Sequence, residues 1–249
     1  MNIKLLSYNI QSWDMNDRRI GGVINLIKEH NPDIICLQEV TPSWFTILRK
    51  EFSDVYGFCG RDRYHGDKEI PTSRREKNNV LYRKDRFELI WSHTYWLGPD
   101  LFHQCKIEES TLNRVFTCVY LKDKITGKKF QQICTHLEFS NPISRKIQAT
   151  ILCDYLKTQT VPTLLAGDFN SEPVEKAYQL ISEYMDDIGT QFNETRTTYH
   201  AYWKEPAKRI DFIFKNDNIE PVSFKIIEDQ FEGLPPSDHF PLESEIFVK

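Results

Sequence analysis

The stretch of this chain that most constrains its fold is an apolar run followed at once by a glycine and two polar side chains. The run extends from Val161 to Ala166, and Gly167-Asp168-Phe169-Asn170 follows it. A short apolar run is typical of a buried strand, and a glycine at its end indicates a turn or a close backbone approach. Asp168 and Asn170 would point the same way from an extended strand end. The stretch therefore predicts an α/β protein whose buried strand delivers a carboxylate and an amide to its carboxyl-terminal rim.

Five further stretches place isolated polar residues where predicted strands end. Because such ends meet along one edge of a sheet, we expect these residues to converge on Asp168 and Asn170. The stretches are Ser7-Tyr8-Asn9, Leu37-Gln38-Glu39, Thr135-His136-Leu137, Arg209-Ile210-Asp211 and Ser237-Asp238-His239.

The predicted elements alternate between strand and helix at the start of the chain, which indicates an α/β class. Strands are expected at residues 3–10, 33–37, 79–82, 87–90, 115–121, 130–135, 161–166, 210–214, 222–227 and 242–248. Helices are expected at residues 17–30, from Pro42 to about Lys50, from Pro142 and, as a short helix, from Pro173. The polar residues 57–78 are expected to form a long loop.

Apolar spacing predicts which face of each helix is buried. The first helix is expected to bury Ile20, Val23, Ile24 and Ile27, the third Ile143, Ile147, Ile151, Leu152 and Tyr155, and the short one Ala177, Leu180 and Ile181.

Composition sets limits on size and partners. The 249 residues, 40% of them apolar, suffice for one large core, so we expect residues 1–249 to form a single domain. A net charge of −4 does not suggest a protein that coats nucleic acid. The charge is uneven, since residues 61–86 hold nine Lys or Arg and five acids, whereas residues 168–249 hold eight and seventeen. A basic stretch can contact an anion, and an acidic half can concentrate cations.

The six cysteines are widely spaced, without a CxxC pair, which favours free, buried thiols over zinc ligands and indicates a reducing compartment. No signal-peptide pattern and no run of eighteen apolar residues occurs, so we expect a soluble cytoplasmic protein without a membrane span. Nothing in the sequence indicates an obligate protein partner.

The polar residues at strand ends suggest a hard metal ion. An oxygen-rich set suits Mg²⁺ or Mn²⁺ better than zinc, and histidines beside such an ion move protons or clamp phosphate. Glu39, with Asn9 beside it, is a plausible holder of the ion. Such a site suits hydrolysis of a phosphate ester. The set comprises Glu39, Asp168, Asp211 and Asp238, with Asn9, Asn170, His136 and His239.

In their order and context these motifs resemble those of the endonuclease/exonuclease/phosphatase superfamily, a group of deoxyribonuclease-like phosphoesterases. The similarity covers about residues 2 to 247, and it is strongest to small bacterial members, with some likeness to tyrosyl-DNA phosphodiesterases. His136 sets the chain apart from the apurinic endonucleases. The resemblance implies a two-sheet β-sandwich flanked by helices on both outer faces, with the site at the shared rim.

The resemblance also implies roles for single residues. Glu39 is similar to the principal metal ligand, with Asn9 and Asp238 close to the metal. Asp168, helped by Asn170, would orient or deprotonate the attacking water. Asp211 would orient His239, which is a base if neutral and a charge stabiliser if protonated, and His136 would contact the scissile phosphate.

We therefore expect a Mg²⁺- or Mn²⁺-dependent phosphoesterase that uses direct water attack, since no motif presents an activated Ser or Cys. The preferred substrate is a phosphodiester of nucleic acid, DNA or RNA. The alternatives are sugar, inositol or lipid phosphates, or a catalytically silent binding protein. Arg114 and His200 are candidate substrate contacts, and a surface role is the alternative for Arg114.

Overall fold

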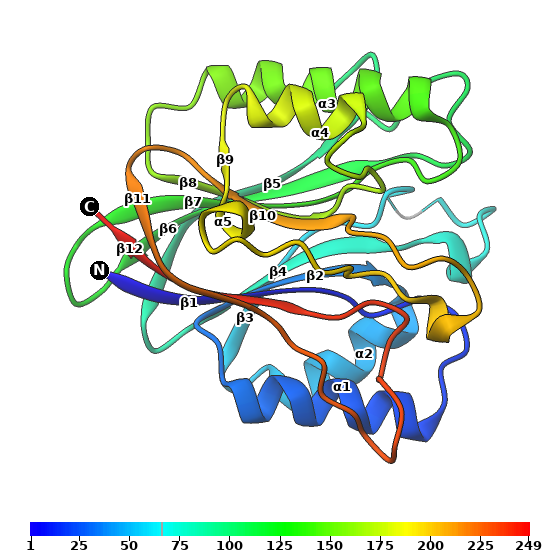
Figure 1. Ribbon diagram of the computed structural model, residues 1–249, viewed down its shortest axis with the longest axis horizontal. Coiled ribbons are helices and arrows are strands. Elements are labelled where there is room, and N and C mark those ends of the chain that lie inside the picture. The colour runs from blue at the N-terminus through cyan, green and yellow to red at the C-terminus, as the bar shows by residue number, and fades with distance from the viewer. Residues whose placement is uncertain (66) are drawn as a thin grey trace.

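Two six-stranded mixed sheets pack face to face with helices on both outer faces, as the computed structural model shows for residues 1–65 and 67–249 (Figure 1). The first sheet has the order β11-β12-β1-β2-β4-β3, and the second has the order β5-β6-β7-β8-β10-β9. The first comprises β1 (Asn2–Asn9), β2 (Ile34–Val40), β3 (Tyr56–Cys59), β4 (Lys77–Arg83), β11 (Ile219–Ile226) and β12 (Leu242–Val248). The second comprises β5 (Phe87–Trp96), β6 (Val115–Asp123), β7 (Lys129–His136), β8 (Thr163–Asp168), β9 (Asp186–Asp187) and β10 (Asp211–Lys215). This four-layer α/β sandwich confirms the predicted fold class.

The helices begin where side chains can cap them. α1 (Asp17–His30) and α2 (Pro42–Phe52) cover the first sheet, and α3 (Pro142–Lys157) and α4 (Lys176–Ser182) cover the second (Figure 1). Asn16, Thr41 and Asn141 each accept a hydrogen bond from a backbone N–H of the first turn of their helix. Three short elements complete the described chain: α5 (Ile188–Gln191), η1 (Thr72–Arg74) and η2 (Ala201–Trp203).

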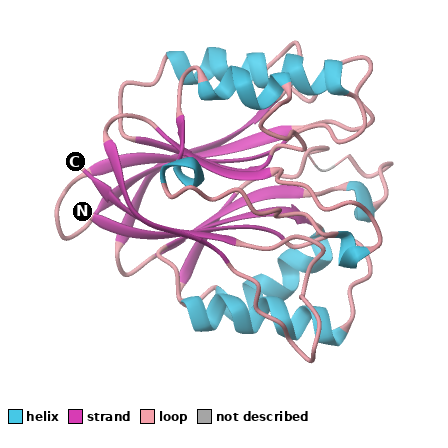
Figure 2. Cartoon of the chain, viewed as in Figure 1, coloured by secondary structure: helices cyan, strands magenta, loops and turns pink. Residues whose placement is uncertain are grey.

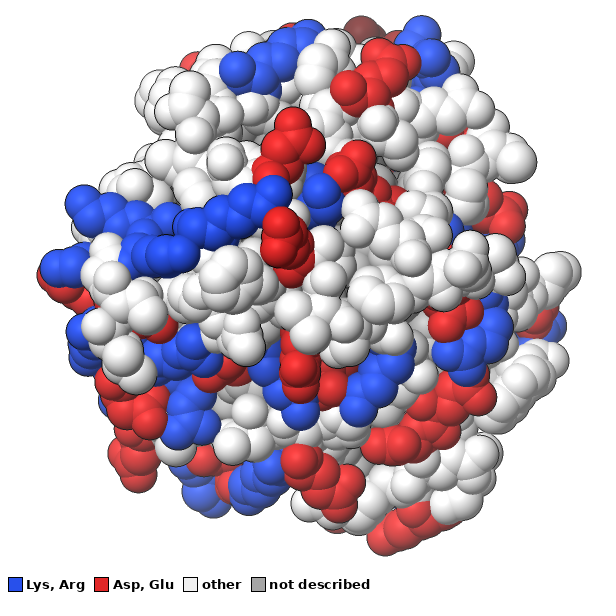
Figure 3. Space-filling model, turned by 60° about the vertical axis from the view of Figure 1, so that its left-hand side comes forward, with Lys and Arg blue, Asp and Glu red and all other residues white. Residues whose placement is uncertain are grey.

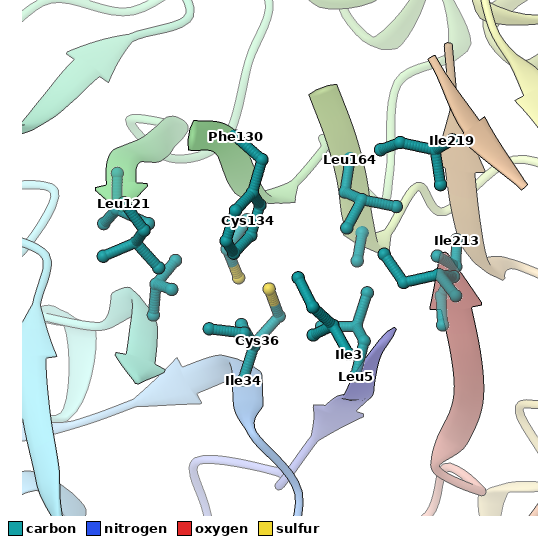
Figure 4. Close-up of a cluster of buried hydrophobic side chains, with 14 of the residues drawn as sticks. Ile3, Leu5, Ile34, Cys36, Leu121, Phe130, Cys134, Leu164, Ile213 and Ile219 are labelled. Atoms are coloured by element: carbon teal, nitrogen blue, oxygen red, sulfur yellow. The ribbon is translucent and has the colours of Figure 1, made fainter. Parts of the chain in front are cut away.

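The central core lies between the two sheets (Figure 4). Alternate residues of the first sheet, such as Leu5 and Cys36, face Cys134 and Leu164 of the second, and all four are buried. Because the outer faces of both sheets are also covered by helices, the central strands are apolar on both sides. This double burial explains the continuous apolar runs in the sequence.

Two parallel strand pairs bring the polar strand ends together. β1 pairs with β2 so that Asn9 lies opposite Gln38, and β7 pairs with β8 so that His136 lies opposite Asp168. β10 runs antiparallel to β8 and places Asp211 opposite Asp168. These ends meet at the rim away from the two chain termini, where long loops gather (Figure 2).

The long-loop prediction for residues 57–78 was wrong at both ends. β3 occupies residues 56–59, and β4 begins at Lys77. β3 is a short edge strand whose only described sheet neighbour is β4, so it carries too little apolar alternation to be recognised in the sequence. β9, α5 and η2 were not predicted either, and each has four residues or fewer.

The predicted buried face of α3 was also wrong in part. Ile143 and Ile147 are exposed, at 63% and 37%, whereas Arg145 and Gln148 are buried. Hydrogen bonds explain why these two polar side chains are buried. Arg145 Nη1 donates to the Glu138 carbonyl, and Gln148 Oε1 accepts from the Glu138 N–H. These bonds rotate the helix toward the loop after β7.

The other helix predictions hold in part. In α1, Val23 and Ile27 are buried as expected, with Ile20 and Ile24 partly buried. In α3, Leu152 is buried, and Ile151 and Tyr155 are partly buried; in α4, which starts at Lys176 rather than Pro173, Ala177 and Ile181 are buried and Leu180 partly so.

All six cysteines are free, as predicted; Cys105 is partly exposed and the others are buried. Among the helices that the structure describes, none is both long and apolar enough to cross a membrane. On the face shown in Figure 3, acidic and basic side chains are interspersed, and several Lys and Arg side chains lie next to one another in a short band.

Candidate active site

The polar strand ends surround a pocket of about 560 Å³ at the shared rim of the sheets. Seven of the predicted site residues line it, namely Glu39, Arg114, His136, Asp168, Asn170, Asp238 and His239. Asn9 and Asp211 lie directly behind this wall, hydrogen-bonded to residues that form it. The predicted convergence is therefore present in the structure.

Asn9 joins the two halves of the site. Its Nδ2 donates to Glu39 Oε1 and to Asp168 Oδ2, both at 3.0 Å, and lies 3.5 Å from His239 Nε2. Its Oδ1 accepts from the Gln11 N–H, which fixes the orientation of the amide. Asn9 thus presents its nitrogen to the two carboxylates, and its predicted place beside a metal stays a prediction.

Glu39 stands on strained backbone at the end of β2. Its φ of 62° is in the left-handed region, next to an irregularity in the pairing of β2 with β4. The conformation turns the side chain toward the pocket, where Oε2 accepts from the Ser12 N–H at 2.7 Å. Burial would raise the pKa of Glu39, but the hydrogen bonds from Ser12 and Asn9 outweigh it and lower the pKa. The carboxylate is therefore ionised at neutral pH.

A chain of hydrogen bonds holds His239. Its Nδ1 lies 2.9 Å from Asp211 Oδ2, which also accepts from Thr198 Oγ1 at 2.6 Å. Burial alone would lower the pKa of His239, but the nearby carboxylates, above all Asp211, raise it to about 10. The imidazole is therefore charged at neutral pH, and its Nε2 is 3.7 Å from Asp168 Oδ2.

The pKa values of Asp168 and His136 shift in opposite directions, each toward the neutral form of the side chain. Burial, reinforced by the charge of Asp211, raises the pKa of Asp168 to about 7. Burial, with the charges of Arg114 and Arg63, holds the pKa of His136 well below its usual value, so this imidazole is neutral. Its Nε2 lies 3.5 Å from Asp168 Oδ2. The site therefore contains one charged and one neutral histidine on either side of a single carboxyl group.

Steric crowding explains why residue 167 is a glycine. A Cβ at this position would lie 2.0 Å from the carbonyl oxygen of Thr135 on the neighbouring β7, and the φ of Gly167 is 152°. The close approach lets β8 deliver Asp168 beside His136. Asn170 follows in the left-handed region, donates from Nδ2 to the Leu137 carbonyl, and gives its own N–H to Asp168 Oδ1.

The structure treats the two predicted substrate contacts differently. Arg114 is buried and lines the pocket, so it is not a surface arginine. His200 is not among the lining residues. It is 1% exposed, packs against Phe240 with ring centres 4.2 Å apart, and accepts from the Tyr202 N–H. A substrate contact by His200 stays a prediction, and a histidine between tyrosines carries no signal in the sequence of which way it faces.

Several residues that shape the site were missed. Ser12 donates its N–H to Glu39, Thr198 supports Asp211, and Ser237 Oγ donates to the Asn9 carbonyl. Arg63 and Trp13 line the pocket. Their neighbours in space come from distant segments, so the sequence held no signal for them beyond the Ser-Asp-His motif that contains Ser237.

The donor set fits a hard divalent cation. Glu39, Asp168 and Asp238 line one pocket, and within the described residues the ionisable bases within 4.0 Å of them are only histidines. Atoms of Asp168, Asp211 and His239 also lie within 4.8 Å of one another. Asp211 lies behind the pocket wall, whereas Glu39 and Asp238 line the pocket, where they could meet an ion.

The chain is thus a two-sheet α/β sandwich with clustered carboxylates and a paired histidine at its shared rim. The sequence profile of the Endonuclease/Exonuclease/phosphatase family matches residues 6–239, and the chain belongs to this family.

Known proteins of similar sequence and structure agree with this assignment. The chain is 26% identical to Nocturnin of Drosophila melanogaster over 97% of its length and 46% of that protein. It is 22% identical to the CCR4-Not complex 3'-5'-exoribonuclease subunit Ccr4 of Emericella nidulans, over 96% and 48%. The chain thus spans about half the length of these relatives. The crystal structure of an endonuclease/exonuclease/phosphatase from Bacteroides vulgatus superposes with a TM-score of 0.89 at 26% identity and covers 100% of both chains.

Proposed function

We propose that this protein hydrolyses phosphate esters with the help of Mg²⁺ or Mn²⁺, by direct attack of water on phosphorus. The observation that carries the proposal is the convergence of Glu39, Asp168 and Asp238 on one pocket that also holds a charged imidazole. A divalent ion bound there would neutralise phosphoryl oxygens and hold the substrate in line for attack. Glu39 and Asp238 would hold the ion.

Asp168 is the group placed to receive a proton from water. Burial keeps its pKa near neutrality, where a carboxylate is an effective base, and Asn9 and Asn170 fix both of its oxygens. His239, charged through Asp211, would donate from Nε2 to a phosphoryl oxygen rather than act as the base. Neutral His136 would donate its ring N–H to the same phosphoryl group.

Two further observations support the proposal. Among the described residues that line the pocket there is no serine or cysteine, so the pocket offers neither of these nucleophiles for a covalent phosphoryl intermediate. The complete set of polar positions also argues against a silent binding protein, since a protein that only binds has no need of a buried Asp-His pair.

The first substrate candidate is a phosphodiester of nucleic acid. The name of the Ccr4 relative and the basic stretch at residues 61–86 favour it. The second candidate is a phosphomonoester of a sugar, an inositol, a lipid or a nucleotide. It is favoured by Glu172 and Glu205, which line the pocket and would repel a polyanion more than Lys208 attracts it, while Glu175 is paired with Arg145 at 2.8 Å. The free cysteines further support a cytoplasmic location.

The test is a substrate panel with controlled metal. Hydrolysis of p-nitrophenyl phosphate, bis-p-nitrophenyl phosphate and single- and double-stranded DNA would be measured with Mg²⁺, Mn²⁺ or EDTA. We expect metal-dependent turnover of at least one ester, lost in Asp168→Ala. Activity that persists in EDTA, or in Asp168→Ala, would contradict the proposal.

Binding of DNA separates the substrate candidates further. If the basic stretch contacts nucleic acid, neutralising the exposed Arg74 and its neighbour Arg75 should weaken DNA binding and flatten its dependence on salt. Unchanged binding would remove the support that this stretch gives to the nucleic-acid candidate.

A further inference from the structure

Arg114 is a buried cation that faces the pocket with an unsatisfied guanidinium. It immediately precedes β6, is 3% exposed and lines the pocket beside His136. Its Nε is buried and has no hydrogen-bond partner among the described residues. A guanidinium taken out of water without acceptors is costly unless an anion completes it, and its planar donors match the oxygens of a phosphate.

The nearest carboxylate does not serve as that acceptor. Glu138 Oε2 lies 3.8 Å from Arg114 Nε, beyond hydrogen-bond distance. Its two oxygens already accept 2.6 Å hydrogen bonds from Ser110 and Thr111. Glu138 therefore balances the charge of Arg114 without a hydrogen bond to it. Because Nε is buried, a phosphoryl group in the pocket would meet the Nη donors.

A second, much smaller hollow lies beside Arg114. It shares Arg63, Glu76, Arg114 and His136 with the main pocket, and Asn78, Asn113 and Val115 complete its lining. Arg63 forms a 2.8 Å ion pair with Glu76 there. Its volume of about 10 Å³ is about that of one water molecule, so a polymer cannot continue through it.

Another part of the pocket lining differs in character. Glu172 and Glu205 line the pocket with one exposed cation, Lys208, and with the exposed aromatic rings of Trp13 and Phe139, so acids outnumber bases among these residues. Trp13 follows β1 and Phe139 follows β7, so one ring comes from each sheet. This part suits an uncharged or hydroxyl-bearing group and disfavours further phosphates.

We propose that Arg114 receives the terminal phosphoryl group of a phosphomonoester, and that the hollow beside it, too small for a chain to pass, selects such ends over internal phosphodiester linkages. The inference rests on the proposed hydrolytic function and decides between its two substrate candidates. In the reaction, the oxygen of water forms a bond to phosphorus as the bond from phosphorus to the ester oxygen breaks. One proton of the water passes to the departing alcohol, and the other stays with the released inorganic phosphate. A monoester dianion offers one more free oxygen than a diester, and Arg114 takes it.

The first measurement compares kcat/KM of the metal-supplied wild-type protein on p-nitrophenyl phosphate and bis-p-nitrophenyl phosphate, which share a leaving group. Circular single-stranded DNA, which has no ends, is a third substrate. We expect the monoester to be preferred by at least about 10-fold and the circle to remain intact. Equal or better turnover of the diester, or cleavage of the circle, overturns the inference while leaving the proposed function in place. If no ester is hydrolysed with either metal, the proposed function itself fails.

The second measurement uses Arg114→Met and Arg114→Lys, with Arg49→Met on the exposed face of α2 as a matched control. Arg114→Met should lower kcat/KM for the monoester by about 100-fold and for the diester by about 10-fold or less, so the preference falls. Arg114→Lys should lie between, and Arg49→Met should match wild type. Competitive inhibition by inorganic phosphate should weaken in parallel.

An unchanged ratio of the two substrates in Arg114→Met, with phosphate inhibition intact, would show that another group receives the phosphoryl oxygens. Should Arg114→Met fail to fold, Arg114→Lys decides the matter. It keeps the charge but loses the planar fork, so a preference identical to wild type would overturn the inference.

Discussion

The buried guanidinium of Arg19 makes a sharp prediction about what holds the site loops in place. Arg19 lies in the first turn of α1, is 1% exposed and donates to five backbone carbonyls. The carbonyls belong to Ile10, Gln11, Trp13, Asp14 and Pro236. Four of them lie in the loop that follows Asn9, and the fifth precedes the Ser237-Asp238-His239 segment. One side chain therefore ties together the two segments that carry opposite sides of the site.

The expected cost of Arg19→Met follows from those bonds. Each buried carbonyl left without a partner costs about 1–3 kcal/mol, and some of that is recovered as the loop relaxes and the buried charge is removed. We expect a loss of about 4 kcal/mol in the free energy of unfolding, which corresponds to a melting temperature lower by roughly 8–16 °C for a chain of this size. Because the segments that bear Asn9 and His239 would separate, kcat/KM on any phosphate ester should fall as well.

The assay is urea unfolding followed by circular dichroism, with Arg18→Met as a matched control. Arg18 is the preceding residue and also donates to carbonyls, but at 3.3 to 3.4 Å and with partial exposure. Its loss should cost less than about 1 kcal/mol. If Arg19→Met is no more destabilising than Arg18→Met, the guanidinium does not hold the two segments and the reasoning is refuted.

Three further predictions follow from the structure. Gly167→Ala should lower the free energy of unfolding by about 3 kcal/mol or more, because the added Cβ would lie 2.0 Å from the Thr135 carbonyl oxygen. Chemical unfolding measures this loss, and a change under about 1 kcal/mol would contradict the steric explanation. Burial would raise the pKa of Glu138, but its hydrogen bonds outweigh burial and lower the pKa to about 2. The stability that Glu138 contributes is therefore complete above the ordinary pKa of 4.5 and is lost as the pH falls toward 2. The unfolding free energy of wild type should drop more steeply below pH 4.5 than that of Glu138→Gln, and parallel curves would contradict this account. Removal of divalent ions with EDTA should abolish ester hydrolysis, and addition of Mg²⁺ or Mn²⁺ should restore it. In Glu39→Gln, the metal concentration that gives half the maximal rate should rise at least about 10-fold, and a metal dependence identical to wild type would exclude Glu39 as a ligand.

Much of the fold could be predicted because the central strands are buried on both faces. The apolar runs around Leu5, Ile35 and Leu165 leave no choice but a sheet covered on both sides, and capping residues such as Thr41 mark where helices begin. The edge strand β3 and the rotation of α3 could not be predicted in this way. Their positions depend on partners elsewhere in the chain, such as the Glu138 backbone that binds Gln148.

The candidate site also has features that the sequence predicted and features that only the tertiary structure set. The sequence by itself determined which side chains end the strands, since Asn9, Glu39, His136 and Asp168 each close an apolar run and a parallel sheet brings such ends to one rim. Only the tertiary structure decided their states. Asp211 charges His239, Arg114 and burial keep His136 neutral, and Asn9 turns its nitrogen toward two carboxylates. The physical reason is that residue type and order are local properties, whereas burial and the distance between charges are set by segments far apart in the chain.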